Sequence, residues 1–249
     1  MILYIRANVC VILRDFIKSI KKKEKYKLMY KIETHLHTKL ISKCGWLYPE
    51  EIVKSYYDCG YSGICVTEHY NRTCFEYAGI DLSSNGDKLN AFLEGFRQVK
   101  KAAEKYGIVV YEGAELRFDQ CDNDYLIYGF SHELLADPDR IIKMGIHNFI
   151  SLSRADGAIL FQAHPFRPSC IPAPAEYLDG IEVRNMNCRH NNHNDLALEY
   201  AERHNLLQSG GSDCHRPGDE CTSGIISDYL PKDSAEFASL LRSGNYSII

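Results

Sequence analysis

Residue types that bind divalent cations recur along this sequence, each at or just after the end of a short apolar run. In chain order they are His35, His37, Glu68, His69, Glu115, His132, His164, Asp213 and His215. A divalent cation needs several imidazole nitrogens or carboxylate oxygens within about 2.0–2.6 Å. One such residue alone is more typical of an ordinary polar loop. Their recurrence at the ends of so many apolar runs predicts a metal site.

The elements that would position these residues alternate between strand-like runs and stretches with helical periodicity. We predict strands at residues 30–34, 64–67, 108–111, 125–128, 158–161, 181–183 and 206–209. The helical stretches begin at Pro49, cover 89–106, begin again near Pro138, and cover 195–203 and 234–243. Repeated strand–helix units predict parallel strands, whose C-terminal ends meet on one face of a barrel or an open sheet. The sequence has no glycine-rich dinucleotide motif and no phosphate-binding P-loop.

Composition and charge narrow the class of protein. The 249 residues are 45% hydrophobic and 25% charged, which is ordinary for a globular chain of one barrel-sized domain. Residues 1–31 contain nine Lys and Arg against two acidic residues, whereas the rest contains 20 basic and 31 acidic side chains. An acidic body argues against a stable nucleic-acid complex, which needs a basic face. No apolar run is long enough to be a transmembrane segment.

The cysteine pattern indicates the cellular compartment, and the basic leader, residues 1–28, indicates a domain boundary. The ten cysteines are scattered and form no CxxC pair, which favours a reducing cytoplasm over a disulfide scaffold or a zinc ribbon. Residues 1–28 lack the uninterrupted apolar stretch of a secretory signal. We interpret them as a basic extension ahead of a core domain at 29–249, with an amphipathic surface helix as the alternative.

Five ordered motifs give the sequence a resemblance to a known family. They are Glu33–Thr38 (ETHLHT), Val66–His69 (VTEH), Gly113–Glu115 (GAE), Ala163–Pro165 (AHP) and Gly211–His215 (GSDCH). Together they resemble the PHP (polymerase and histidinol phosphatase) family of metal-dependent phosphoesterases, from Met29 to the C-terminus. The resemblance implies a distorted (β/α)7 TIM-like barrel, with two or three divalent ions (Zn, Mn or Fe) at the C-terminal ends of the strands.

The resemblance also implies three sets of metal ligands. They are His35, His37, Glu115 and Asp213 for the first ion, Glu115, His132 and His164 for the second, and Cys44, His69 and His215 for the third. The sequence departs from the family pattern in two places. The loop 38–45 offers only Cys44 as a ligand, and Glu68 stands where Asp is more usual.

The implied reaction is hydrolysis of a phosphate ester by a metal-bridging hydroxide, with Asp213, Glu115 and His215 as the catalytic residues. A phosphate also needs guanidinium groups, which contact it through two parallel hydrogen bonds. Arg167 is the first candidate because it lies three residues after a predicted ligand, and Arg184 is the second.

The expected substrate is a phosphorylated small molecule such as histidinol phosphate or a nucleotide. Two other functions stay open. One is a metal-dependent amidohydrolase, which also uses a barrel with an HxH motif, and the other is a non-catalytic domain that binds a metal or a ligand.

Overall fold

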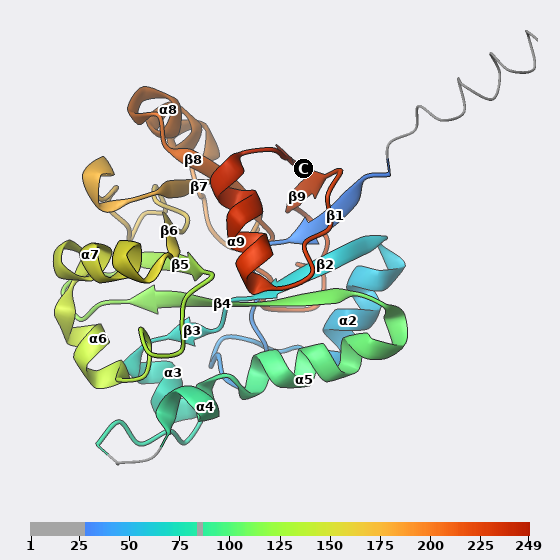
Figure 1. Ribbon diagram of the computed structural model, residues 1–249, viewed down its shortest axis with the longest axis horizontal. Helices are drawn as coiled ribbons and strands as arrows, with labels where there is room; N and C mark the ends of the chain where they lie inside the picture. The colour runs from blue at the N-terminus through green and yellow to red at the C-terminus, as the bar shows by residue number, and fades with distance from the viewer. Residues whose placement is uncertain (1–27, 84–86) are drawn as a thin grey trace, which may run out of the picture.

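The computed structural model describes residues 28–83 and 87–249, so the predicted leader at 1–28 lies almost wholly outside the described residues. A single sheet coils into a nearly closed barrel, which confirms the predicted α/β barrel (Figure 1). Its strand order is β10-β9-β1-β2-β4-β5-β6-β7-β8, with β3 paired to β4. The strands are β1 (Tyr30–Glu33), β2 (Tyr61–Val66), β3 (His69–Tyr70), β4 (Val109–Arg117), β5 (Asp124–Tyr128), β6 (Ile159–Gln162), β7 (Gly180–Asn185), β8 (Leu207–Gly211), β9 (Ile225–Ser227) and β10 (Ser247–Ile248).

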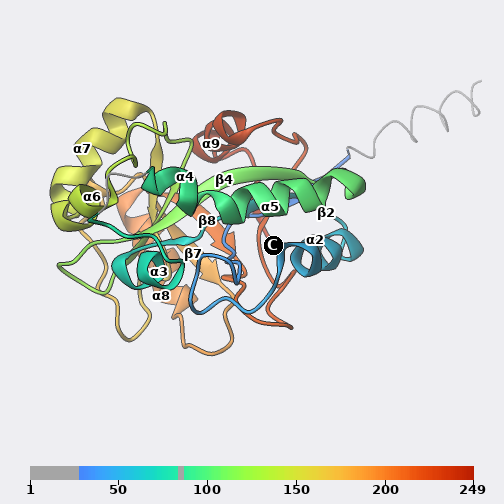
Figure 2. The same ribbon diagram turned by 90° about the horizontal axis from the view of Figure 1, so that it is seen from below.

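Helices cover the outside of this sheet. They are α2 (Pro49–Asp58), α3 (Arg72–Tyr77), α4 (Lys88–Phe92), α5 (Glu94–Ala103), α6 (Pro138–Met144), α7 (Ile146–Asp156), α8 (Asn194–His204) and α9 (Ser234–Ser243). Figures 1 and 2 show α5 along one side of β4 and α9 on the other. Helix α9 begins where the Asp233 side chain accepts a hydrogen bond from the Glu236 amide, and it ends at Gly244 in the left-handed region.

The barrel closes at the C-terminal ends of its parallel strands, where the predicted site lies. The segment after β1 meets the segment after β8 through a parallel bridge between Leu36 and Cys214. The His37 amide donates to the Cys214 carbonyl at 3.0 Å, and the Thr34 hydroxyl donates to the Gly210 carbonyl at 2.8 Å. These bonds join the first and last parallel strands and bring their polar residues into one space.

Strand β5 departs from the predicted parallel arrangement. It pairs antiparallel with both β4 and β6. Strand β4 extends to Arg117, well beyond the predicted end at residue 111, and only residues 118–123 connect it to β5. A link this short makes a hairpin, because a parallel crossover needs about a dozen residues or more. The N-terminal end of β5, at Asp124, therefore lies among the C-terminal ends of its neighbours.

No helix within residues 28–83 and 87–249 is both long and apolar enough to cross a membrane.

Candidate metal centre

The HxH motif follows β1 and points both of its rings into the barrel. Side chains two residues apart on an extended segment share a face, so His35 and His37 lie together while Leu36 between them packs into the apolar core beside α2. Both histidines are fully buried, and their Nε2 atoms are 3.1 Å apart. Two ring nitrogens this close point to a position that one cation could occupy.

Glu115 on β4 lies at the centre of the site, fully buried. Its Oε1 is 3.1 Å from Nε2 of His164 and 3.3 Å from Nε2 of His35. Its Oε2 is 3.3 Å from Nε2 of His37 and 2.7 Å from Nδ1 of His69. Strand β3 pairs with β4 in this register, with His69 opposite Glu115. One carboxylate thus contacts four imidazoles that come from three separate segments of the chain.

Asp213, just after β8, forms a second carboxylate centre. Its Oδ1 lies 3.4 Å from Nε2 of His35, 3.5 Å from Nε2 of His37 and 3.2 Å from Nδ1 of His215. The backbone of Asp213 has φ of 51°, a left-handed conformation that is uncommon outside glycine. This turn directs the carboxylate into the barrel.

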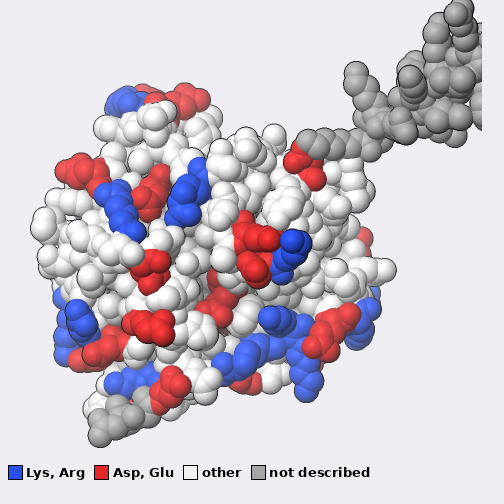
Figure 3. All heavy atoms as spheres, viewed as in Figure 1, with Lys and Arg blue, Asp and Glu red and all other residues white. Residues whose placement is uncertain are grey.

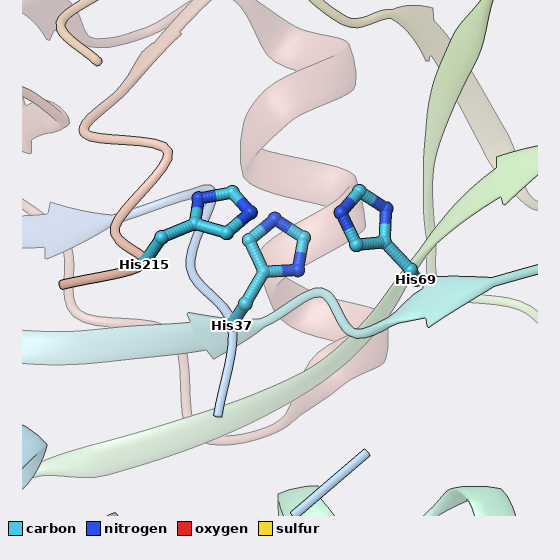
Figure 4. A group of neighbouring side chains, drawn as sticks. All are labelled: His37, His69 and His215. Carbon is cyan, nitrogen blue, oxygen red and sulfur yellow. The ribbon is translucent and has the colours of Figure 1, made fainter. Parts of the chain in front are cut away.

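A third group consists of His37, His69 and His215. Figure 4 shows these three rings turned toward one another, although they come from the segment after β1, from β3 and from the segment after β8. The half-buried Cys44 thiol contacts both His69 and His215. Burial opposes ionisation of this thiol, but the two histidines lower its pKa to about 6. Cys44 therefore lies beside His69 and His215, the two residues with which the family resemblance groups it around the third ion.

The hydrogen bonding of these donors fits bound cations. Three fully or nearly fully buried atoms, Nδ1 of His69, Oε2 of Glu115 and Oδ1 of Asp213, have no partner with hydrogen-bond geometry among residues 28–83 and 87–249. The first two lie only 2.7 Å apart, yet they are not aligned as donor and acceptor. Buried polar atoms are rarely left without a partner, and a metal ion supplies one.

Charges in the cluster compensate one another. Burial opposes charge at His35, but Glu115, Glu182 and Asp213 raise its pKa well above the usual range. Burial likewise opposes ionisation of Glu115, yet His69 and His35 lower its pKa well below the usual value. Without a cation, protonated imidazoles neutralise the carboxylates. Divalent ions could replace those protons, because a ligating imidazole must be neutral.

His132 does not join the cluster, which corrects its predicted role as a ligand of the second ion. Its side chain is 62% exposed, and its Nε2 lies 2.9 Å from Oε1 of Glu112. Glu112 and Glu115 are three residues apart on β4 and so point to opposite faces. The reason is the direction of β5, which carries His132 away from the end of the barrel where the other ligand candidates gather.

Arg184 also lies apart from the cluster, which corrects its predicted role in substrate binding. The pairing of β7 with β8 shifts register between Glu182 and Arg184. After this bulge Asn185 is buried beside Asp213, whereas Arg184 is exposed in an outer groove next to α8. A bulge changes which side chains face inward, and strand periodicity alone does not reveal it.

Arg167, in contrast, reaches the cluster. Its Nη2 donates to Oδ2 of Asp213 at 2.7 Å, and its Nε donates to Oδ1 of Asn192 at 3.0 Å. The side chain is 12% exposed. The loop that carries it begins at His164, whose carbonyl accepts from the Arg167 amide. A guanidinium held in this position can contact both a cation-bound anion and Asp213.

Two carboxylates behind the histidines were not predicted as site residues. Glu182 places Oε1 3.0 Å from Nδ1 of His35, and its Oε2 accepts from the His164 amide at 3.0 Å. Glu33 accepts backbone amides of His35 and Ser212 at 2.9 and 3.0 Å. Both are fully buried. Their signal in the sequence is a glutamate next to apolar strand residues, Glu182 between Ile181 and Val183 and Glu33 after Ile32, where a buried charge needs partners.

Glu68 has a structural role rather than a place among the ligands. Its carboxylate accepts from the Thr38 amide and hydroxyl, and from the Ser42 hydroxyl at 2.6 Å. Burial raises its pKa to about 7, although these hydrogen bonds oppose the shift. Glu68 thereby holds the loop 38–45, which carries Cys44.

An open cavity of about 680 Å³ adjoins the third group. His69 and Cys44 lie in its wall, together with the basic side chains of Lys43, Arg72 and Arg117. Its volume lies in the range usual for sites that bind small molecules. A larger groove of about 780 Å³ contains Arg184 in its wall and none of the predicted metal ligands.

The family of the chain follows from a comparison with known protein families. The PHP domain matches residues 33–210, which is most of the chain and includes all the ligand candidates except Asp213 and His215. The chain belongs to the PHP domain family. None of the curated proteins compared with the chain matches it.

Solved structures share this fold at low sequence identity. A two-domain protein from Bacteroides vulgatus, which contains a predicted PHP-like metal-dependent phosphoesterase, superposes with a TM-score of 0.64 at 19% identity, over 89% of this chain and 65% of that one. PsfC from Pseudomonas syringae gives 0.64 at 18% identity, over 89% and 91%. An amidohydrolase from Chromobacterium violaceum with bound sulfate and no metal gives 0.50 at 15% identity, over 88% and 97%. The present chain spans less than two thirds of the Bacteroides protein.

Proposed function

We propose that this protein is a metal-dependent phosphomonoesterase that acts on a phosphorylated small molecule. The observation that carries the proposal is the convergence of buried imidazoles on Glu115 and Asp213, each of which has one oxygen without a hydrogen-bond partner in the part of the chain that the structure describes. Membership of the PHP family supports it. His35, His37, Glu115 and Asp213 would hold the first ion, and His69 and His215 a further one with Cys44.

Bound divalent ions would lower the pKa of a coordinated water from about 15.7 to about 7 and neutralise phosphate oxygens. The residues of the chain would do the rest. Arg167 would orient the phosphate, because Asn192 and Asp213 already hold its guanidinium toward the cluster. Asp213, Glu115 and His215 would act as the catalytic group, since they lie in contact with the imidazoles and carboxylates that would hold the ions.

The expected substrate is small and anionic. The cavity beside His69 has three basic side chains, Lys43, Arg72 and Arg117, against the carboxylates of Asp119 and Asp122. Arg72 is already paired with Asp119 and Arg117 with Asp124, which leaves Lys43 as the best placed of the three to attract an anion. On the face in Figure 3, acidic and basic side chains are interspersed, with Lys and Arg most numerous over α5. The described residues on this face form no continuous basic stripe of the kind that tracks a nucleic-acid backbone.

Phosphate release from a panel of phosphomonoesters, with added Mn²⁺ or Zn²⁺, tests the proposal. Asp213→Ala should abolish metal-dependent release, whereas His132→Ala should retain it, because His132 is exposed and paired with Glu112. Amide substrates belong in the same panel, since the Chromobacterium amidohydrolase shares the fold. Metal-dependent cleavage of amides alone would replace the phosphomonoesterase by an amidohydrolase. Absence of both activities in the metal-loaded protein would favour a binding domain.

We also propose that the functional domain spans residues 29–249. The first strand begins at Tyr30, and every ligand candidate lies between residues 35 and 215. A chain that lacks residues 1–28 should keep the melting temperature and turnover of the full chain. A loss of either would assign the basic leader a part in folding or activity.

A further inference from the structure

The reversal of β5 brings a different side chain to the site in place of His132. Asp124, the first residue of β5, has a side chain that is only 2% exposed. Its Oδ2 lies 3.8 Å from Nε2 of His164, which itself contacts Glu115. One ligand atom each from Asp124, Glu115 and His69 also lies within 4.8 Å of the others. Donors that share an ion at about 2.1 Å lie roughly 3–4.2 Å apart, so small rotations would suffice.

The partner of Asp124 leaves its carboxylate able to bind a cation. Arg117 Nε donates to Oδ1 at 2.7 Å, and Arg117 Nη2 donates to Oδ2. An ionised carboxylate offers about four acceptor positions, of which this pair uses two. Carboxylates that ligate metals are themselves commonly held by hydrogen bonds, which fix their orientation.

Arg117 compensates the buried charge of Asp124 from one side. The Arg117 side chain is 39% exposed in the wall of the cavity, whereas the other side of the Asp124 carboxylate faces His164. The exclusion of His132 also leaves Glu115 and His164 as the only remaining ligands among those predicted for the second ion. Two protein ligands are fewer than a stable site normally has.

We propose that Asp124 is a ligand of the second ion, together with Glu115 and His164, and that Arg117 orients its carboxylate. This assignment rests on the proposed metal-dependent function. The ligand set proposed for the second ion has two carboxylates and one imidazole. The set predicted for the third ion, Cys44, His69 and His215, has one thiol and two imidazoles. Oxygen donors suit Mn²⁺, and imidazole and thiolate donors suit Zn²⁺. The second ion should therefore be the one that favours Mn²⁺.

Counting bound ions tests the assignment without any substrate. Wild type, Asp124→Asn and His132→Ala are dialysed against a series of buffered Mn²⁺ concentrations, and bound metal per chain is measured by mass spectrometry. At a concentration that saturates wild type, Asp124→Asn should bind one ion fewer, and His132→Ala should bind as many as wild type. Full occupancy of Asp124→Asn with an unchanged midpoint, or the loss of an ion from His132→Ala, would overturn the assignment.

Two further variants separate a ligand from a structural partner. Arg117→Gln keeps the carboxylate but removes its orienting group, so it should weaken the second ion by about 10–100-fold and still saturate. Asp124→His supplies a nitrogen donor but no negative charge for Arg117, so it should keep the ion and shift its preference toward Zn²⁺. If Arg117→Gln, which keeps the carboxylate, loses the ion as completely as Asp124→Asn, the Asp124–Arg117 pair acts by holding the local structure and Asp124 is not a ligand.

The ion count tests the ligand assignment, the phosphate-release assay tests the phosphomonoesterase, and either proposal can fail without the other. A protein that binds the full set of ions through Asp124 but hydrolyses no phosphate ester would keep the assignment and refute the phosphomonoesterase. A protein that hydrolyses esters while Asp124→Asn retains all its ions would do the reverse.

Discussion

Glu182 lies behind His35, with its Oε1 3.0 Å from Nδ1, while the opposite nitrogen of the same ring faces Glu115 and Asp213. The carboxylate fixes which ring nitrogen carries the proton and leaves Nε2 free for a cation. The second oxygen of Glu182 accepts from the His164 amide and from Asn185. One buried residue therefore positions ligand candidates from two segments that are far apart in sequence.

Replacing Glu182 by Gln should weaken metal binding without removing a ligand. Partners of this kind typically contribute 10–100-fold to metal affinity. The amide oxygen can keep the two N–H donors of His164 and Asn185, but the amide nitrogen then faces Nδ1 of His35, and this mismatch should cost about 1–3 kcal/mol of unfolding free energy. Competition with a chelator measures the affinity and denaturant unfolding measures the stability. Glu199→Gln, on the exposed face of α8, is the control and should change neither. An unchanged affinity in Glu182→Gln would contradict the orienting role.

Arg167→Lys should impair binding of the phosphate ester more than binding of metal. Lysine keeps the charge but loses the planar fork that contacts phosphate through two bonds. We expect KM to rise by about tenfold, or roughly 1.4 kcal/mol, with the number of bound ions unchanged. Arg184→Lys is the matched control, because Arg184 lies in the outer groove and should leave KM at the wild-type value. Equal effects of both variants would argue against a specific phosphate contact.

Gly95 on α5 should be sensitive to the smallest substitution. A Cβ at this position would clash with Oε1 of Glu68, which Thr38 and Ser42 hold in place. Alanine normally stabilises a helix by about 1 kcal/mol relative to glycine. Here the clash should outweigh that gain, and Gly95→Ala should lower the unfolding free energy by about 1–3 kcal/mol. Lys101→Ala on the same helix is the control. A Gly95→Ala protein more stable than wild type would show that Glu68 moves freely.

Removing metal with a chelator should lower the melting temperature. An ion that binds only the folded state stabilises it by about 2.7 kcal/mol when its free concentration is roughly 100 times Kd. The shift should be reversed by added Mn²⁺ and should be much smaller in Asp213→Ala. Scanning calorimetry at fixed protein concentration measures it. Equal melting temperatures with and without metal would mean that the cluster binds no ion in the folded state.

The sequence by itself determined the repeated strand–helix units, and its resemblance to the family predicted the barrel and most of the candidate cluster. Alternation of apolar runs and helical stretches depends on local periodicity, which the chain shows directly. The HxH spacing places His35 and His37 on one face of a strand whatever surrounds it. Glu115, His164, Asp213 and His215 follow apolar runs, and the parallel strands that carry or precede them end at the same edge of the sheet.

Only the tertiary structure decided which candidates meet. The direction of β5 depends on its pairing with β4 and β6, and it reverses the ends of that strand, so that Asp124 enters the site and His132 leaves it. The bulge in β7 likewise turns Asn185 toward the site and Arg184 away from it. Both features arise from hydrogen bonds between strands that are distant in the sequence. Local periodicity shows that a strand exists, but it contains no information about the direction or register of its neighbours.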